Sequence, residues 1–111
     1  MIDISEKDTV YISGPMRHKP FMNFPAFFGM EAFLREIYGC KVLNPARNES
    51  GLTLDQYLAI DLVMVRVSDV IIMLDGWETS EGASLEWHVA KEEGLRIYEQ
   101  MAFKPQGEDD V

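Results

Sequence analysis

The sequence predicts an α/β fold in which helices cover both faces of a parallel sheet of four to five strands. Short β-rich segments alternate along the chain with segments of helical periodicity, and this order is typical of parallel sheets. The segment DVIIMLD, residues 69–75, is almost entirely apolar, as expected for a strand that is buried on both faces. With 111 residues, of which 47% are hydrophobic, the chain has the length of one domain and enough apolar residues for a core.

The first half of the chain contains signals for two strands and two helices. A strand is expected in TVYISGP, residues 9–15, which ends at a Gly-Pro pair. Apolar residues then recur near helical spacing over residues 24–38, and the following glycine supplies a stop. The segment CKVLNP, residues 40–45, is the second expected strand. Thr53 and Gln56 have the spacing of a capping box, which predicts a helix over about residues 53–68.

The second half repeats this pattern after the buried strand. Ser80 is expected to cap a helix that ends before Gly94. The segment LRIYEQ, residues 95–100, is the last expected strand. This order predicts a single Rossmann-like or flavodoxin-like domain over residues 1–100, followed by an acidic tail over residues 101–111.

Composition excludes several classes of partner. The net charge of −9 opposes binding to nucleic acid polymers and to anionic membrane surfaces, and no apolar segment has the length of a membrane span. The first ten residues lack the apolar stretch of a signal peptide, and the single cysteine, Cys40, cannot form an internal disulfide. A cytoplasmic location is therefore expected. With two histidines and one cysteine, we expect no metal site and no cofactor.

The candidate binding residues follow from the predicted fold. In parallel α/β sheets, ligands bind beyond the carboxyl ends of the strands. The residues expected there are Ser13, Gly14, Pro15 and Arg17 after the first strand, Asn44 after the second, Asp75, Gly76 and Trp77 after the third, and Ser80 and Gly82 at the start of the next helix.

A dense basic run, Arg17-His18-Lys19, lies among these candidates in an otherwise acidic chain. The helix that begins after Ser80 offers free N–H groups and a partial positive charge at its N-terminus. Together these features predict a site for a small anion such as a phosphate. The alternative is that the basic run is only a solvated loop.

Two carboxylates stand where a helix needs only small or apolar side chains. Glu86 shares a stripe of its helix with small residues, Gly82, Ala83, Ala90 and Gly94, which can pack close to the sheet or another helix, so we expect Glu86 to face a cleft rather than bulk water. Asp61 lies within the apolar part of the preceding helix. Glu86 alone could be a half-exposed residue near a helix start, favoured by the helix dipole. As a pair in different environments, they can divide nucleophilic and proton-transfer roles, as in glycosidic bond cleavage.

These motifs resemble a known superfamily. YISGP, NPA, the helix with Asp61, and LDGWETSEGASLEWHVA are similar to segments of the nucleoside 2-deoxyribosyltransferase superfamily over residues 8–98. They look most like a small, mostly uncharacterised bacterial and phage branch. The resemblance implies cleavage or transfer of the N-glycosidic bond of a (deoxy)nucleoside or its 5'-monophosphate. It also implies that Glu86 attacks the anomeric carbon and that Asp61 assists proton transfer to the base.

The chain also resembles the 2'-deoxynucleoside 5'-phosphate N-hydrolases. In those enzymes a serine and a glycine before the nucleophile hold the 5'-phosphate, and Ser80 and Gly82 match them. Ser84 stands in place of a second glycine, and Arg17 resembles an arginine of their first loop. The transferases complete their site with polar residues near the C-terminus of a neighbouring subunit, for which this chain has no evident counterpart.

Other interpretations fit the same sequence. One is a phosphoribohydrolase related to lysine-decarboxylase-like proteins, which also have a helical glutamate after a Gly-rich turn. A second is a non-catalytic nucleotide-binding module that senses or sequesters a nucleotide, and a third is a structural or assembly protein. Independently of these, the apolar residues of 24–37, with Met64 and Val65, predict a homo-oligomer built through helices.

Overall fold

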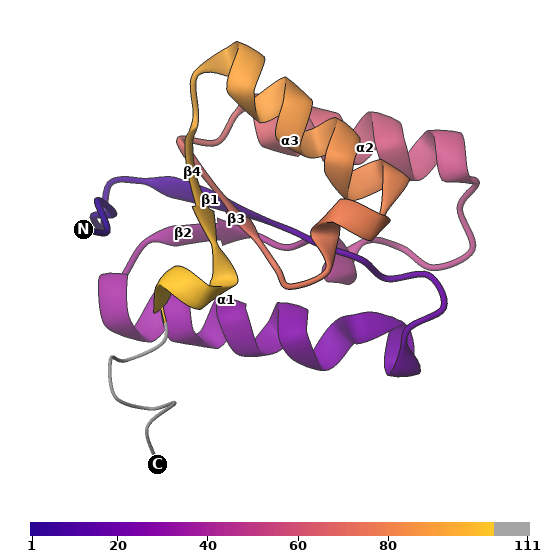
Figure 1. The fold of residues 1–111 in the computed structure, drawn as a ribbon, viewed down its shortest axis with the longest axis horizontal. Coiled ribbons are helices and arrows are strands. Elements are labelled where there is room, and N and C mark those ends of the chain that lie inside the picture. The colour runs from indigo at the N-terminus through magenta and orange to yellow at the C-terminus, as the bar shows by residue number, and fades with distance from the viewer. Residues whose placement is uncertain (104–111) are drawn as a thin grey trace.

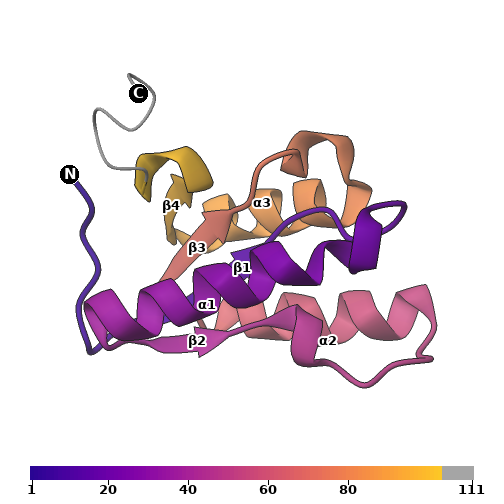
Figure 2. The ribbon, with the colours of Figure 1, turned by 90° about the horizontal axis from the view of Figure 1, so that it is seen from below.

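The computed structural model describes residues 1–103, which form a parallel sheet between two helical layers (Figure 1). The strands pair in the order β2-β1-β3-β4, which confirms the predicted α/β fold class with four strands. Helix α1 covers one face of the sheet, and α2 and α3 cover the other (Figures 1 and 2). The bounds are β1 Thr9–Ser13, α1 Phe24–Tyr38, β2 Lys41–Leu43, α2 Leu54–Arg66, β3 Val70–Met73, α3 Glu81–Glu93 and β4 Arg96–Glu99.

The helix ends are fixed by the capping residues that the sequence indicated. The Thr53 hydroxyl accepts a hydrogen bond from the Gln56 N–H, and the Gln56 side chain accepts one from the Thr53 N–H, so the capping box at α2 is complete. The Ser80 hydroxyl accepts a hydrogen bond from the Ala83 N–H at the start of α3. Gly94 ends α3 with a φ of +77°, which glycine adopts without steric cost.

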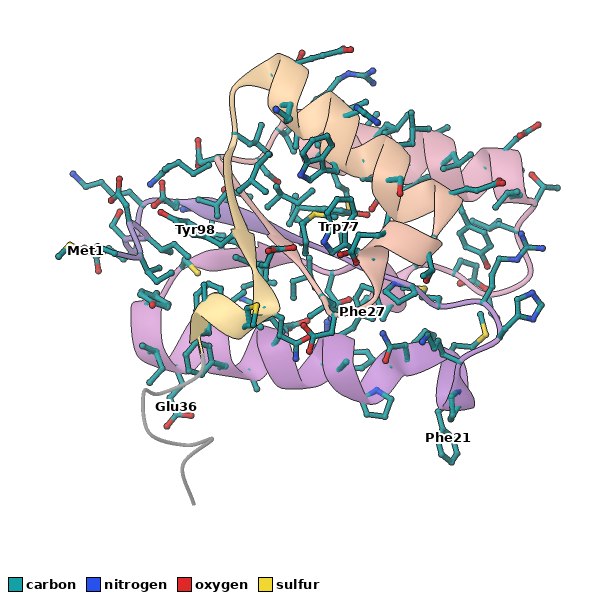
Figure 3. The ribbon with its side chains drawn as sticks, viewed as in Figure 1. Met1, Phe21, Phe27, Glu36, Trp77 and Tyr98 are labelled. Carbon is teal, nitrogen blue, oxygen red and sulfur yellow. The ribbon has the colours of Figure 1, made fainter. Side chains whose placement is uncertain are left out.

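The alternation of side chains along the strands builds two core layers. Val10, Ile12 and Ile72 face α1 and pack with its buried side chains, whereas Tyr11 and Ile71 face α2 and α3. The residues of α1 that contribute to the first layer are Phe27, Met30 and Leu34, and Phe27 lies between this helix and the sheet in Figure 3.

The residues from which an oligomer was predicted mostly belong to this core. Val65 is fully buried, and Met64 packs against the same layer on α2, so neither is available as an exposed contact surface. The four-stranded sheet covers more of the Phe- and Met-rich helix than we expected, because Phe27, Met30 and Leu34 all point to it. The oligomer itself stays a prediction.

The ordered fold continues past the predicted end of the domain at residue 100. A short 3-10 helix, η4 (Gln100–Phe103), follows β4, and the Phe103 ring packs edge-to-face against Phe33, Tyr38 and Tyr98. Phe103 therefore extends the first core layer rather than beginning a tail. The rest of the predicted acidic tail, residues 104–111, lies outside the described residues. Across residues 1–103, no helix combines the length and apolar character that crossing a bilayer requires.

Candidate active site

A carboxyl group is buried at the carboxyl end of β1. Glu86 of α3 is only 5% exposed, and its Oε1 accepts a hydrogen bond of 2.6 Å from the Oγ of fully buried Ser13. Ala83 and Ala90 share the buried face of α3 with Glu86. Their small side chains let the helix lie close to the sheet, so the last residue of β1 can reach the carboxylate.

Burial raises the pKa of Glu86 to about 8, despite the hydrogen bond from Ser13, which favours the charged form. The nearby charge of Asp61 raises this pKa further. At neutral pH the Glu86 carboxyl group is therefore mainly protonated in the free protein. A carboxyl group with such a pKa in a polar cluster is typical of a functional site.

Asp61 of α2 is the second member of this carboxyl pair. Burial raises its pKa to about 6, although Asn48 Nδ2 donates a hydrogen bond of 2.8 Å to Asp61 Oδ1. Protonated Glu86 stabilises ionised Asp61, and ionised Asp61 keeps the proton on Glu86. Between their two pKa values the pair holds one proton. The structure thus brings together the two acids that the helix pattern had singled out.

Tyr11 is a member of the site that the sequence analysis missed. Its side chain is fully buried, and among residues 1–103 its hydroxyl has no hydrogen-bond partner. Burial, together with the charges of Glu86 and Asp61, raises the pKa of Tyr11 well above its ordinary value. The hydroxyl therefore stays protonated and free to donate. The signal was present, because Tyr11 and Ser13 lie two residues apart in a buried strand and so share one face.

Two of the three glycines among the candidate site residues are required by the backbone. A Cβ at Gly14 would lie 2.8 Å from the Cβ of Leu74, so only glycine lets the ends of β1 and β3 approach this closely. Gly76 has a φ of +86° and forms the turn after β3. A Cβ at Gly82 would make only ordinary contacts, at 3.9 Å from Leu58 and 4.0 Å from the Ser80 hydroxyl. Pro15, next to Gly14, is buried.

Asn44 directly follows β2, as predicted, and its side chain is hydrogen-bonded within the protein. Its Nδ2 donates to Glu31 Oε1 at 2.9 Å and to the Phe27 carbonyl at 3.4 Å, and its Oδ1 accepts from the Ala46 N–H at 2.9 Å. Glu31 is buried and needs donors, so the Asn44 amide joins α1 to the end of β2. Both ends of this amide are therefore occupied in the described conformation.

Trp77 lies just beyond the carboxyl end of β3, as predicted, and its side chain is engaged by neighbouring residues. Its ring stacks on Trp87 at a centroid distance of 5.6 Å, and its Nε1 donates to Glu99 Oε1 at 3.1 Å. These residues line an open hollow of about 410 Å³ with Lys91 and Ile97, and the lining does not include Glu86. The adjacent Asp75 is exposed, and its N–H donates to the Gln100 side chain.

The basic run forms an exposed loop after β1. Arg17 and Lys19 make no salt bridge with any of residues 1–103, and Lys19 Nζ lies 3.9 Å from the position of a Cβ on Gly76. This contact places the loop beside the turn after β3. Further along the same loop, Phe21 has a φ of +53° and is 82% exposed, and Figure 3 shows it projecting from the body of the protein.

We also searched the described residues for a possible metal site. Within residues 1–103, no group of three or more His, Cys, Asp or Glu side chains is placed to hold a metal ion. The chemistry that the site can perform with its own residues is that of a carboxyl pair, a serine and a protonated tyrosine.

The fold resembles that of a solved enzyme, the 2-desoxiribosyltransferase from Leishmania mexicana, with a TM-score of 0.64 at 22% sequence identity. The match covers 83% of this chain and 63% of that one, so the chain spans less than two thirds of the enzyme's length. The two proteins therefore share the same α/β fold. The chain belongs to the family described as domain of unknown function DUF4406, which matches residues 8–99. No curated protein sequence matches the chain.

Proposed function

We propose that the protein cleaves or transfers the N-glycosidic bond of a nucleoside or its 5'-monophosphate, with Glu86 as the nucleophile. The observation that carries this proposal is the pairing of buried Glu86 with half-buried Asp61, whose carboxyl groups raise and lower each other's pKa. The similarity of the fold to a deoxyribosyltransferase supports a nucleoside as the substrate class.

The shared proton suggests how the first step proceeds. Its transfer from Glu86 to Asp61 leaves Glu86 as a carboxylate and Asp61 as an acid. The Glu86 carboxylate attacks the anomeric carbon, the C–N bond breaks with its electron pair going to the base, and Asp61 protonates the departing base. Water or a second base then attacks the same carbon, the bond to Glu86 breaks, and Asp61 accepts the proton.

Tyr11 and Ser13 stabilise Glu86 when it carries a charge. Ser13 already donates a hydrogen bond to Oε1, and the free hydroxyl of Tyr11 can donate a second one. Hydrogen bonds to the charged form of a carboxyl group favour that form. They therefore assist both the proton transfer that creates the nucleophile and the departure of Glu86 from the sugar.

The test of this function is incubation with a panel of nucleosides and nucleoside monophosphates, followed by chromatographic detection of free base. Release of base from at least one substrate supports an N-glycosidase, and matched ribose and 2-deoxyribose substrates distinguish phosphoribohydrolase activity from deoxyribose chemistry. Exchange with a second free base would show a transferase. Binding without base release would indicate a nucleotide-binding module, and neither binding nor release would indicate a structural protein.

Base release is expected to be fastest between about pH 6 and about pH 8. Below this range Asp61 also binds a proton, so Glu86 cannot transfer its own, and above it the pair has lost its last proton. The measurement is kcat/KM as a function of pH with the best substrate of the panel. A rate that rises steadily through the whole range would contradict the one-proton mechanism.

The variant Asn48→Ala offers a directional check on this profile. Asn48 donates to Asp61 and so lowers its pKa, and removal of this donor should move the acidic limb to higher pH. The alkaline limb, which reports loss of the proton from Glu86, should move much less. An unchanged acidic limb would show that Asp61 does not control it.

Monophosphates are expected to bind more tightly than the matching nucleosides. Arg17 is exposed and has no salt-bridge partner among residues 1–103, and Ser80 begins a helix whose N–H groups favour anions. A charge-assisted contact contributes about 1.5–3 kcal/mol, which is about tenfold or more in affinity. Calorimetry should show that Arg17→Ala removes most of the preference and Ser80→Ala removes part of it.

The matched control for this prediction is Lys41→Ala. Lys41 is also an exposed cation, but it is the first residue of β2. It therefore lies at the amino end of the parallel strands, opposite to the candidate site at their carboxyl ends. Its replacement changes the net charge by the same amount and should leave the preference intact. Equal affinities of the wild-type protein for a nucleoside and its monophosphate would mean that the basic run is only a solvated loop.

A further inference from the structure

The outward face of α2 carries an apolar stripe with no cover in the described structure. Ile60, Val63 and Val67 are 40%, 58% and 61% exposed, and they follow one another at spacings of three and four residues. This is the spacing of a seam between two paired helices. The opposite side of α2 packs into the core through Leu62 and Val65. Packing within this chain buries only one of these two apolar sides, so the outward side is available to contact another molecule.

Two charges flank this stripe, and they are of opposite sign. Asp55 stands in the first turn of α2 and Arg66 in the last turn, about 16 Å apart along the helix axis. At 100° per residue they lie only about 20° apart around the helix, so both are on the same side of the stripe. Neither forms a salt bridge with any of residues 1–103. Their midpoint falls beside Ile60, within the stripe.

We propose that the stripe of Ile60, Val63 and Val67 docks against the same stripe of a second copy of this chain, with the two α2 helices antiparallel. A two-fold axis brings each flank of one helix opposite the same flank of the other. Arg66 then faces Asp55 of the partner subunit, and the same ion pair forms a second time across the axis. The charges on α2 therefore pair only in the antiparallel arrangement, since a parallel two-fold pair would place the charged flanks on opposite sides of the contact.

The first test is the mass of the protein in solution, which does not depend on the proposed enzymatic function. Light scattering and sedimentation equilibrium at micromolar concentration should give a dimer for the wild-type chain. Val63→Lys places a charge in the centre of the contact and should give a monomer with unchanged circular dichroism. The matched control is Ile37→Lys on α1, which replaces a side chain of similar exposure (60%) and should leave the dimer intact.

The second test uses the two charges and reads the orientation of the helices. Asp55→Arg and Arg66→Glu should each weaken dimerisation by about tenfold, because two surface ion pairs are replaced by like charges. The double variant restores both pairs with reversed signs and should dimerise nearly as well as the wild-type chain. Both reversals place unfavourable charges at the helix ends, so a more stable helix cannot explain the recovery.

Three results would overturn the proposal. A wild-type chain that is strictly monomeric at micromolar concentration would show that the stripe has no such partner. A Val63→Lys variant that remains dimeric would place the contact elsewhere on the surface. A double charge variant no better than the single variants would exclude the antiparallel pairing. None of these results bears on base release, so failure of the dimer and failure of the proposed enzyme can be told apart.

Discussion

Glu86→Gln is expected to abolish base release while the fold is retained. Glutamine has the same shape, and its side-chain oxygen can still accept the hydrogen bond from Ser13. It cannot form the covalent bond to the anomeric carbon, so the rate should fall by several orders of magnitude. The measurement is the single-turnover rate of base release with the best substrate found for the wild-type protein.

The matched control for this variant is Glu92→Gln. Glu92 lies on the same helix and is exposed, so its replacement makes the same chemical change outside the carboxyl pair. Activity of the control should equal that of the wild-type protein. A Glu86→Gln variant with wild-type rates would eliminate Glu86 as the nucleophile. Retention of substrate binding by that variant would separate a loss of chemistry from a loss of structure.

The same substitution is expected to stabilise the folded protein at neutral and alkaline pH. Burial and the neighbouring Asp61 raise the pKa of Glu86 from about 4.5 to about 8 in the folded state. The unfolded chain therefore releases this proton at a lower pH than the folded chain does. The stability of the wild-type protein should fall as the pH rises from about 4.5 through about 8. Asp61, whose pKa is raised to about 6, should contribute in the same direction.

Glutamine does not ionise in this pH range, so the stability of the variant does not fall in this way as the pH rises. Each pKa unit corresponds to about 1.4 kcal/mol, and the amide bears a cost of its own because burial leaves some of its hydrogen-bonding groups unpaired. The net gain in the free energy of unfolding should be about 2–4 kcal/mol near pH 8. Denaturant unfolding of both proteins between about pH 5 and pH 8 measures this difference, which should shrink towards the acidic end.

Glu31→Gln provides a control with the opposite sign. Glu31 is as buried as Glu86, but Arg47, Asn44 and Arg35 donate hydrogen bonds to it, and they lower its pKa to about 2. A lowered pKa stabilises the fold above about pH 4.5, and this contribution is lost as the pH falls towards 2. Glu31→Gln should therefore destabilise the protein at neutral pH. If both glutamine variants were destabilised equally, the raised pKa of Glu86 would not lower the stability of the wild-type protein as predicted.

The sequence by itself determined the order of the helices and strands, the start of α2 and both ends of α3. The capping box of α2, the Ser80 cap of α3 and the glycine at position 94 act over four residues or fewer, so they can be recognised without knowledge of the rest of the chain. The apolar character of β3 predicted a strand covered on both faces. The helical stripe of small residues predicted that Glu86 faces inward, as it does.

The partners of these side chains were decided by the tertiary structure. Ser13 and Glu86 are 73 residues apart in sequence and meet only because α3 packs over the end of β1. The Asn44 amide is occupied because α1 brings buried Glu31 to the end of β2, and the Trp77 ring turns towards Trp87 and Glu99. Local sequence patterns predict which face of a helix or strand is buried. Which side chain fills that space, and at what pKa, depends on contacts between elements that are distant along the chain.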